Sequence, residues 1–150
     1  MKRFLLILAV CLTALSSSYG QGKLQESSSE KRPVWVKKDP GSAYLMKVRG
    51  ESTVSINSAR DAAFDKLHDI VVSSVTKYLL GINFQGRDVN DILEAVENTD
   101  FVRNISEWTA VETYWEHRVI KKQDVYLYYI LYDFNDFEKK KIAFEVDNIL

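Results

Sequence analysis

Glu112, Glu116 and His117 are the residues whose types and spacing come closest to acid–base chemistry. They lie in a stretch rich in threonine, valine and aromatic residues, which predicts a strand. In an extended strand Glu112 and Glu116 share one face, roughly 13 Å apart, and His117 points to the other face. That separation exceeds the roughly 5 to 9.5 Å of glycosidase carboxylate pairs. We therefore expect solvated charges that pair with nearby basic side chains: Lys47, Arg49 or Arg118.

The remaining sequence offers little other chemistry. His68 follows Leu67 in a helical pattern, which predicts a partly exposed helix position and not a metal ligand. There is no G-x-S-x-G, H-E-x-x-H, glycine-rich phosphate loop or paired C-x-x-C motif. The one cysteine is Cys11, so residues 21–150 contain no thiol. We expect no enzyme activity, no cofactor and no metal site.

The first 20 residues have the three parts of a secretory signal. Lys2 and Arg3 make a positive start, and residues 4–15 form an apolar run that is too short to span a membrane. Ser18 and Gly20 fit the small residues before a cleavage site at Gln21. The sequence predicts a signal peptide over residues 1–20 and export to the periplasm or cell envelope.

Cys11 leaves a second fate for the leader open. Leu8-Ala9-Val10-Cys11 resembles the lipobox of bacterial lipoproteins, whose cysteine is acylated after cleavage. Val10 stands where that motif usually has a small residue, which is a departure from the pattern. We favour export without a lipid and expect membrane anchoring only if Cys11 is lipidated.

Composition and charge narrow the function classes. The 150 residues are 46% hydrophobic and 27% charged, as in an ordinary globular protein, and suffice for one domain after the leader. The formal net charge is −1, and removing Lys2 and Arg3 leaves 18 basic and 21 acidic residues, or −3. A nucleic-acid-binding protein usually carries a basic stripe. The longest basic block here is Lys139-Lys140-Lys141, so we expect no nucleic-acid partner.

The chain after the leader divides into a tether and one domain. Residues 21–32 are polar and serine-rich, which predicts a flexible tether. Residues 33–150 then form a single domain, with Trp35 packed against it. Residues 44–52 alternate apolar and charged side chains, typical of a half-buried strand.

Helical periodicity follows the first strand. Residues 55–80 repeat apolar residues at three- and four-residue steps, which predicts a long amphipathic helix with Leu67 and Ile70 buried. Asp88 is placed to cap a shorter helix that carries Ile92 and Val96.

The last third of the chain predicts two strands and a helix. Residues 105–119 read as a long strand, 121–124 as a hairpin loop and 125–134 as a central strand that is apolar on both faces. Asn135 or Asp136 caps a final helix. The order β-α-α-β-β-α predicts the α+β class: a small, mainly antiparallel sheet of three or more strands, packed with one long amphipathic helix.

Several of these elements resemble one bacterial family. The features are Pro33-x-Trp35-Val36, a strand from Tyr44 to Gly50, an alanine-rich helix, Glu112-x-Tyr114-Trp115 and Tyr126-x-Tyr128-Tyr129. Residues 33–135 resemble the Lpp-twenty type of small bacterial envelope lipoproteins and the related N-terminal domain of the flagellar-assembly T protein. The resemblance implies a periplasmic or surface-exposed domain without catalytic residues to transfer.

The aromatic residues are the best candidates for a binding surface. Core packing is their default role, and the alternatives are a partner-binding surface or a small apolar-ligand pocket. The candidate partner-binding residues are Trp108, Tyr114, Trp115, Tyr126 and Tyr128. We expect an exported, non-enzymatic domain that binds an envelope protein or surface component. The alternatives are a periplasmic hydrolase that uses Glu112, Glu116 or His117, and a carrier of a small apolar ligand.

Overall fold

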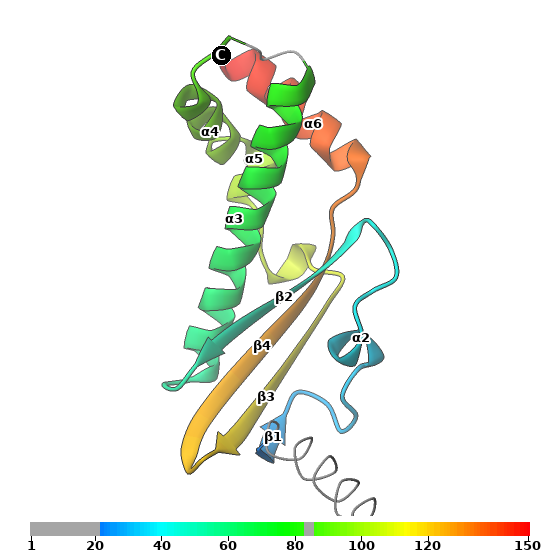
Figure 1. The fold of residues 1–150 in the computed structure, drawn as a ribbon, viewed down its shortest axis with the longest axis vertical. Helices are drawn as coiled ribbons and strands as arrows, with labels where there is room; N and C mark the ends of the chain where they lie inside the picture. Colours follow the sequence, from blue (N-terminus) through cyan, green and yellow to red (C-terminus); the bar gives the residue numbers. More distant parts are fainter. Residues whose placement is uncertain (1–21, 83–85) are drawn as a thin grey trace, which may run out of the picture.

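A four-stranded antiparallel sheet carries a long helix on one of its faces (Figure 1). The computed structural model describes residues 22–82 and 86–150; the leader, Cys11 and Gln21 lie outside them. Within this part of the chain no helix has the length and apolar character needed to cross a membrane. The elements are β1 (Lys23–Ser27), α2 (Val34–Lys37), β2 (Leu45–Ser52), α3 (Ile56–Ile82), α4 (Val89–Glu97), α5 (Asp100–Arg103), the short 3-10 turn η1 (Glu107–Thr109), β3 (Glu112–Ile120), β4 (Gln123–Asp133) and α6 (Asp136–Ile149).

The sheet has the order β1-β3-β4-β2, so β4 lies between two partners. Tyr129 of β4 stands opposite Tyr114 of β3 and Arg49 of β2. Residues 127 to 132 of β4 are all buried, although they alternate between the two faces of the sheet. The predicted α+β class and the predicted central strand are confirmed.

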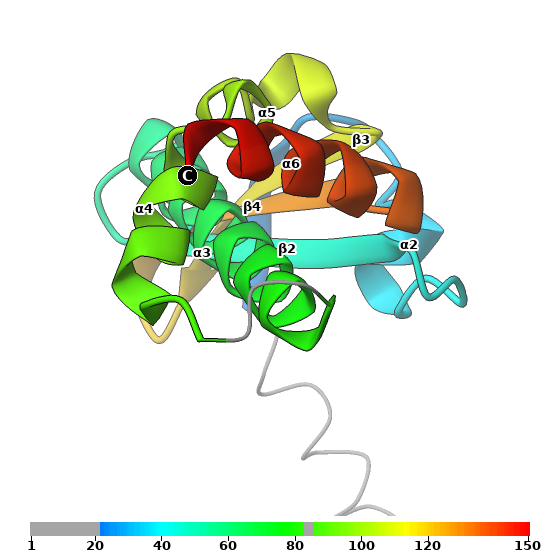
Figure 2. The same ribbon diagram turned by 90° about the horizontal axis from the view of Figure 1, so that it is seen from above.

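Small residues let α3 approach the sheet closely. A side chain at Gly50 of β2 would collide with the backbone of Ala59 and Ala63 in α3. The apolar row that continues along α3 packs against β4, and α4 and α6 pack against the far part of the helix (Figure 2). One hydrophobic core therefore joins α3, α4, α6 and this face of the sheet.

The buried row of α3 differs in one residue from the prediction. Leu67 is fully buried, as predicted, whereas Ile70 is 41% exposed. The buried row advances mainly in four-residue steps, from Ala63 through Leu67 to Val71 and Val75. Ile70 lies three residues after Leu67, on the flank of that row, so it faces solvent.

The predicted tether is wrong for Lys23–Ser27, which form strand β1. β1 pairs antiparallel with β3, with Lys23 opposite Val119 and Ser27 opposite Glu116. Ser28 extends the pairing, because its N–H donates to the Trp115 carbonyl oxygen at 3.0 Å. The edge of a sheet offers backbone donors and acceptors, so a polar segment can pair with it without an apolar face.

The predicted strand over 105–119 begins later, at Glu112. The Thr109 hydroxyl accepts from the Ser106 N–H at 3.0 Å and donates to the Ser106 carbonyl oxygen at 2.8 Å. Such local side-chain hydrogen bonds compete with strand pairing. Here they stabilise the turn η1 where the sequence predicts a strand. The hairpin loop is also shorter than predicted, since β3 and β4 are joined by Lys121 and Lys122 alone, both with positive φ.

Replacement of Leu67 by alanine tests the assigned helix face. Leu67→Ala should lower the free energy of unfolding by about 2–5 kcal/mol, because it leaves a cavity in the core. Ile70→Ala, three residues away and exposed, should cost under about 1 kcal/mol. Denaturant unfolding of both variants measures the difference, and equal losses would contradict the assigned face.

Candidate functional site

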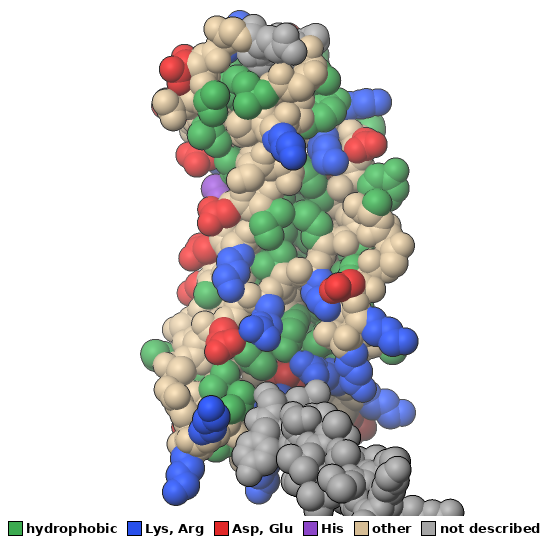
Figure 3. All heavy atoms as spheres, viewed as in Figure 1, with side chains coloured by type: hydrophobic (Ala, Val, Ile, Leu, Met, Phe, Trp, Pro, Cys, Tyr) green, Lys and Arg blue, Asp and Glu red, His purple; other side chains and the backbone are tan. Residues whose placement is uncertain are grey.

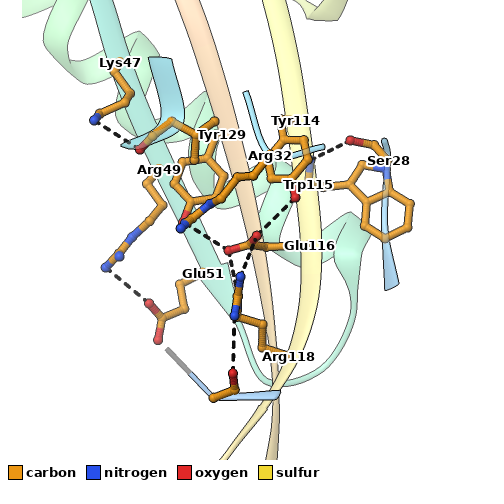
Figure 4. Close-up of polar contacts among 12 residues, drawn as sticks. Ser28, Arg32, Lys47, Arg49, Glu51, Tyr114, Trp115, Glu116, Arg118 and Tyr129 are labelled. Atoms are coloured by element: carbon orange, nitrogen blue, oxygen red, sulfur yellow. Dashed lines mark hydrogen bonds and ion pairs between the residues drawn. The ribbon is translucent and has the colours of Figure 1, made fainter. Parts of the chain in front are cut away.

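The sheet face opposite α3 carries a polar cluster among apolar residues. β3 places Tyr114, Glu116 and Arg118 on this face, and β4 places Leu127 and Tyr129 beside them. Alternate residues of a strand point to the same face, so Tyr114, Glu116 and Arg118 lie together. Figure 4 shows Tyr114, Arg118 and Arg32 converging on the carboxylate of Glu116.

Glu116 is the centre of this cluster and is fully buried. Its Oε1 accepts from Nε of Arg118 at 2.9 Å and pairs with Nη2 of Arg32 at 3.1 Å. Its Oε2 accepts from Nη2 of Arg118 and from the Tyr114 hydroxyl, both at 3.2 Å. Four donors fill the acceptor positions of a carboxylate, and two of its partners are cations, so the buried charge is compensated.

The two arginines also hold the N-terminal segment against the sheet. Arg32 stands just before α2; its guanidinium lies over the ring of Tyr129 and donates to the Tyr129 hydroxyl at 3.0 Å. Arg118 of β3 donates through Nη1 to the Gly22 carbonyl oxygen at 3.3 Å. Val36 of α2 packs on the same face. Trp35 also packs there, as the sequence predicted.

Burial and hydrogen bonds fix the protonation of two members of the cluster. Burial is the main cause that raises the pKa of Tyr114, and the neighbouring Glu116 carboxylate adds to it. The hydrogen bonds to Glu116 raise the pKa of Arg118. Tyr114 therefore stays a neutral hydroxyl donor and Arg118 stays a cation at neutral pH.

A hollow of about 280 Å³ lies beside the cluster. Its charged lining comes from Arg32, Arg49, Glu51, Glu116 and Arg118, and its apolar lining includes Val125 and Leu127. Arg49 and Glu51 come from β2 and form an ion pair of 3.4 Å between partly exposed side chains. The hollow therefore presents three guanidinium groups against two carboxylates, next to an apolar floor.

The structure does not bring the predicted aromatic residues onto one surface. Tyr114 is buried on the Glu116 face, whereas Trp115, Tyr126 and Tyr128 pack on the α3 face. Tyr128 is also buried, and its hydroxyl donates to Glu107 at 2.9 Å. Trp108 belongs to η1, and its side chain lies outside the described part of the structure.

The residues of the hydrolase alternative are also separated. Glu116 and His117 point to opposite faces of β3, and Glu112 is exposed at the start of the strand. His117 pairs with Asp124 at 2.7 Å and stacks on Tyr126. Glu116 does pair with Arg118, as expected, but it is buried and not solvated.

His68 is a partly exposed residue of α3, as predicted. Among the described residues, no group of three His, Cys, Asp or Glu side chains could hold a metal ion.

A larger hollow of about 480 Å³ lies under α6, between α5 and the end of β4. Its charged lining comes from Asp100, Asp133, Glu138, Lys141 and Glu145. One of these groups is already engaged, because Glu145 accepts the backbone N–H of Asp100 at 2.9 Å. None of the five is buried, whereas the smaller hollow is built on a fully buried charge, so we take the smaller one as the candidate site.

Loss of the Glu116 charge should destabilise the whole domain. Glu116→Gln leaves Arg32 and Arg118 without their shared carboxylate, so it should cost about 3 kcal/mol of unfolding free energy. Glu112→Gln changes an exposed glutamate of the same strand and should stay within about 0.5 kcal/mol of the parent. Denaturant unfolding provides the measurement, and a stable Glu116→Gln protein would contradict the role assigned to this charge.

No protein-family model, curated protein or solved structure matches this chain. The resemblance to the Lpp-twenty type of envelope lipoproteins therefore stays a prediction based on the residues named above.

Proposed function

We propose that this chain is an exported domain of the cell envelope that acts by binding and not by catalysis. Its binding site is the hollow beside Glu116, and its ligand is an acidic group of an envelope protein or surface component. The leader-like residues 1–20 support export. The predicted relationship to the Lpp-twenty type agrees with that location.

The charges around the hollow support an acidic ligand. Three arginines and two glutamates line it, which leaves one positive charge in excess. Arg118 is committed to Glu116 and Gly22, whereas the side chain of Arg49 is 57% exposed at the rim. Arg49 can therefore turn from Glu51 to an incoming carboxylate, since exposed ion pairs are worth little.

The size and floor of the hollow indicate how much of a ligand enters. About 280 Å³ is slightly below the range of pockets for drug-sized ligands, which begins at roughly 300 Å³. A single side chain or the end of a peptide fits this space better than a large cofactor. Val125 and Leu127 offer apolar contact beside the charged rim, so an aliphatic residue with a free carboxylate matches the site.

The same geometry disfavours the two alternatives. A hydrolase needs a carboxylate or imidazole that can take a proton from a substrate or water. The oxygens of Glu116 already accept four hydrogen bonds or ion pairs, and His117 is on the other face of β3. A carrier of an apolar ligand needs an apolar enclosure, and the rim of this hollow is charged.

Binding of a terminal carboxylate tests the proposed site. A short peptide that ends in leucine with a free carboxylate should shift the NMR signals of Arg49 and Leu127, and its amidated twin should bind at least tenfold more weakly. Arg49→Gln should weaken binding to a similar degree. Arg60→Gln removes a comparably exposed arginine of α3 and should have no effect. Equal affinity for the two peptides would contradict the proposal.

The N-terminus of the protein isolated from the producing cell tests export. Mass spectrometry should find a chain that begins at or near Gln21 and carries no lipid, because residues 18–20 form the predicted cleavage site. An acylated Cys11 at the N-terminus would establish the anchored alternative. A chain that retains residues 1–20 in the cytoplasm would contradict export.

A further inference from the structure

Two phenylalanines of α6 stand out into water on the side away from the core. Phe137 is 69% exposed and Phe144 is 72% exposed, whereas Ile142 and Val146 on the inner side of the same helix are fully buried. Residues seven apart share one face of a helix. α6 therefore has two apolar faces, and packing within the described residues covers only the inner one.

Lysines flank the outer face of α6. Lys140 and Lys141 lie three and four residues after Phe137, and four and three before Phe144, so they stand on either side of the line between the two rings. Both lysines are exposed, and neither belongs to an ion pair among the described residues. In Figure 3 hydrophobic, basic and acidic side chains lie side by side over α6, at the upper right of the molecule.

The acidic residues of α6 lie beside or behind this face. Glu138 and Glu145 are half-buried and line the hollow under the helix, where Glu145 accepts the Asp100 N–H. Exposed Lys141 borders both this hollow and the outer face. Asp136 pairs with Lys139 at 3.3 Å. At about 100° per residue, exposed Asp147 lies on the same side of the helix as Lys140, seven residues earlier, at the edge of the outer face. The outer face therefore carries two aromatic rings and two lysines against one aspartate, although the chain as a whole is slightly acidic.

We propose that the outer face of α6, formed by Phe137, Lys140, Lys141 and Phe144, docks on the surface of an anionic lipid bilayer. The rings enter the boundary between headgroups and acyl chains, and the lysines contact lipid phosphates. The helix lies on the membrane and does not span it.

A second copy of the chain fits this face less well than a bilayer does. In a two-fold pairing of α6 helices the same patch meets itself, so Lys140 and Lys141 would face the lysines of the partner copy. Like charges in that position oppose association. An anionic lipid surface satisfies both lysines and buries both rings at once.

The inference uses the proposed envelope location only to name a membrane as the available surface. Docking by two rings and two lysines is weak and reversible, comparable to a single membrane-binding signal. It needs no lipid on Cys11. The protein can bind the acidic ligand in the hollow beside Glu116 without binding vesicles, and it can bind vesicles without binding that ligand. The two proposals are therefore tested independently.

Vesicle sedimentation tests the docking face with the protein as the producing cell processes it. The protein should bind phosphatidylcholine vesicles that contain phosphatidylglycerol, and lose binding without phosphatidylglycerol or at high salt. Lys140→Gln with Lys141→Gln should lower the partition coefficient roughly 30-fold. Phe137→Ala with Phe144→Ala should lower it at least tenfold and leave the melting temperature unchanged, since both rings are exposed.

A matched control removes an exposed apolar residue and a lysine elsewhere. Val54→Ala with Lys77→Gln should leave vesicle binding within about twofold of the parent, because neither residue lies on α6. All variants share one N-terminus, so any contribution from residues 1–21 is common to them.

A local measurement separates the α6 face from other sources of binding. Nitroxide-labelled phosphatidylglycerol should broaden the ring NMR signals of Phe137 and Phe144 and spare the methyl signals of Val54. Equal binding to vesicles with and without phosphatidylglycerol would overturn the proposal. So would unchanged binding and broadening in the phenylalanine variant, or a dimer that this variant dissociates.

Discussion

Strand β4 has buried side chains on both faces, and this requires two layers of cover. On one side α3 provides the cover, and Gly50 allows it to come close to the sheet. On the other side no long helix is present among the described residues. The cover there comes from the segment around Arg32 and α2, which lies far from β4 in the sequence. The apolar pattern of a single strand thus determines where the start of the domain must pack.

The short cover on the second face explains why a charge is buried there. α2 has only one buried residue, Val36, so it supplies little apolar contact. Glu116 makes up for the small apolar contact, because its carboxylate pairs with the guanidinium of Arg32 in the N-terminal segment and with that of Arg118 in its own strand. Charge pairing in a site shielded from water is directional, so it fixes where the segment lies as well as holding it. The hollow beside the cluster is the part of this face that the short segment leaves uncovered.

Periodicity in the sequence was a good guide to the elements and a poor guide to the contacts between them. The long helix, the central strand and the Asp88 cap follow from local patterns, and the structure has all three. Arg32 carries no local signal for its partner 84 residues away, because an ion pair across the fold has no period. The sequence does not predict β1 for a related reason. Its pairing with β3 uses backbone groups, and the hydrophobic pattern of the side chains carries no information about these. The burial predicted for Ile70 is wrong, because an apolar side chain does not by itself show which side of the helix faces the core.

The network around Glu116 also bears on how this sequence can diverge. Its acceptors are filled from positions 32, 114 and 118, and a change at any one of them leaves a buried group without its partner. Substitutions there are tolerated only in combination, for example when the acid and both guanidinium groups give way together to apolar side chains. In an alignment of descendants these four columns should covary, whereas exposed positions of the same strand such as 112 should drift independently. The start of the chain and the β3 hairpin would then evolve as one unit, despite the long stretch of sequence between them.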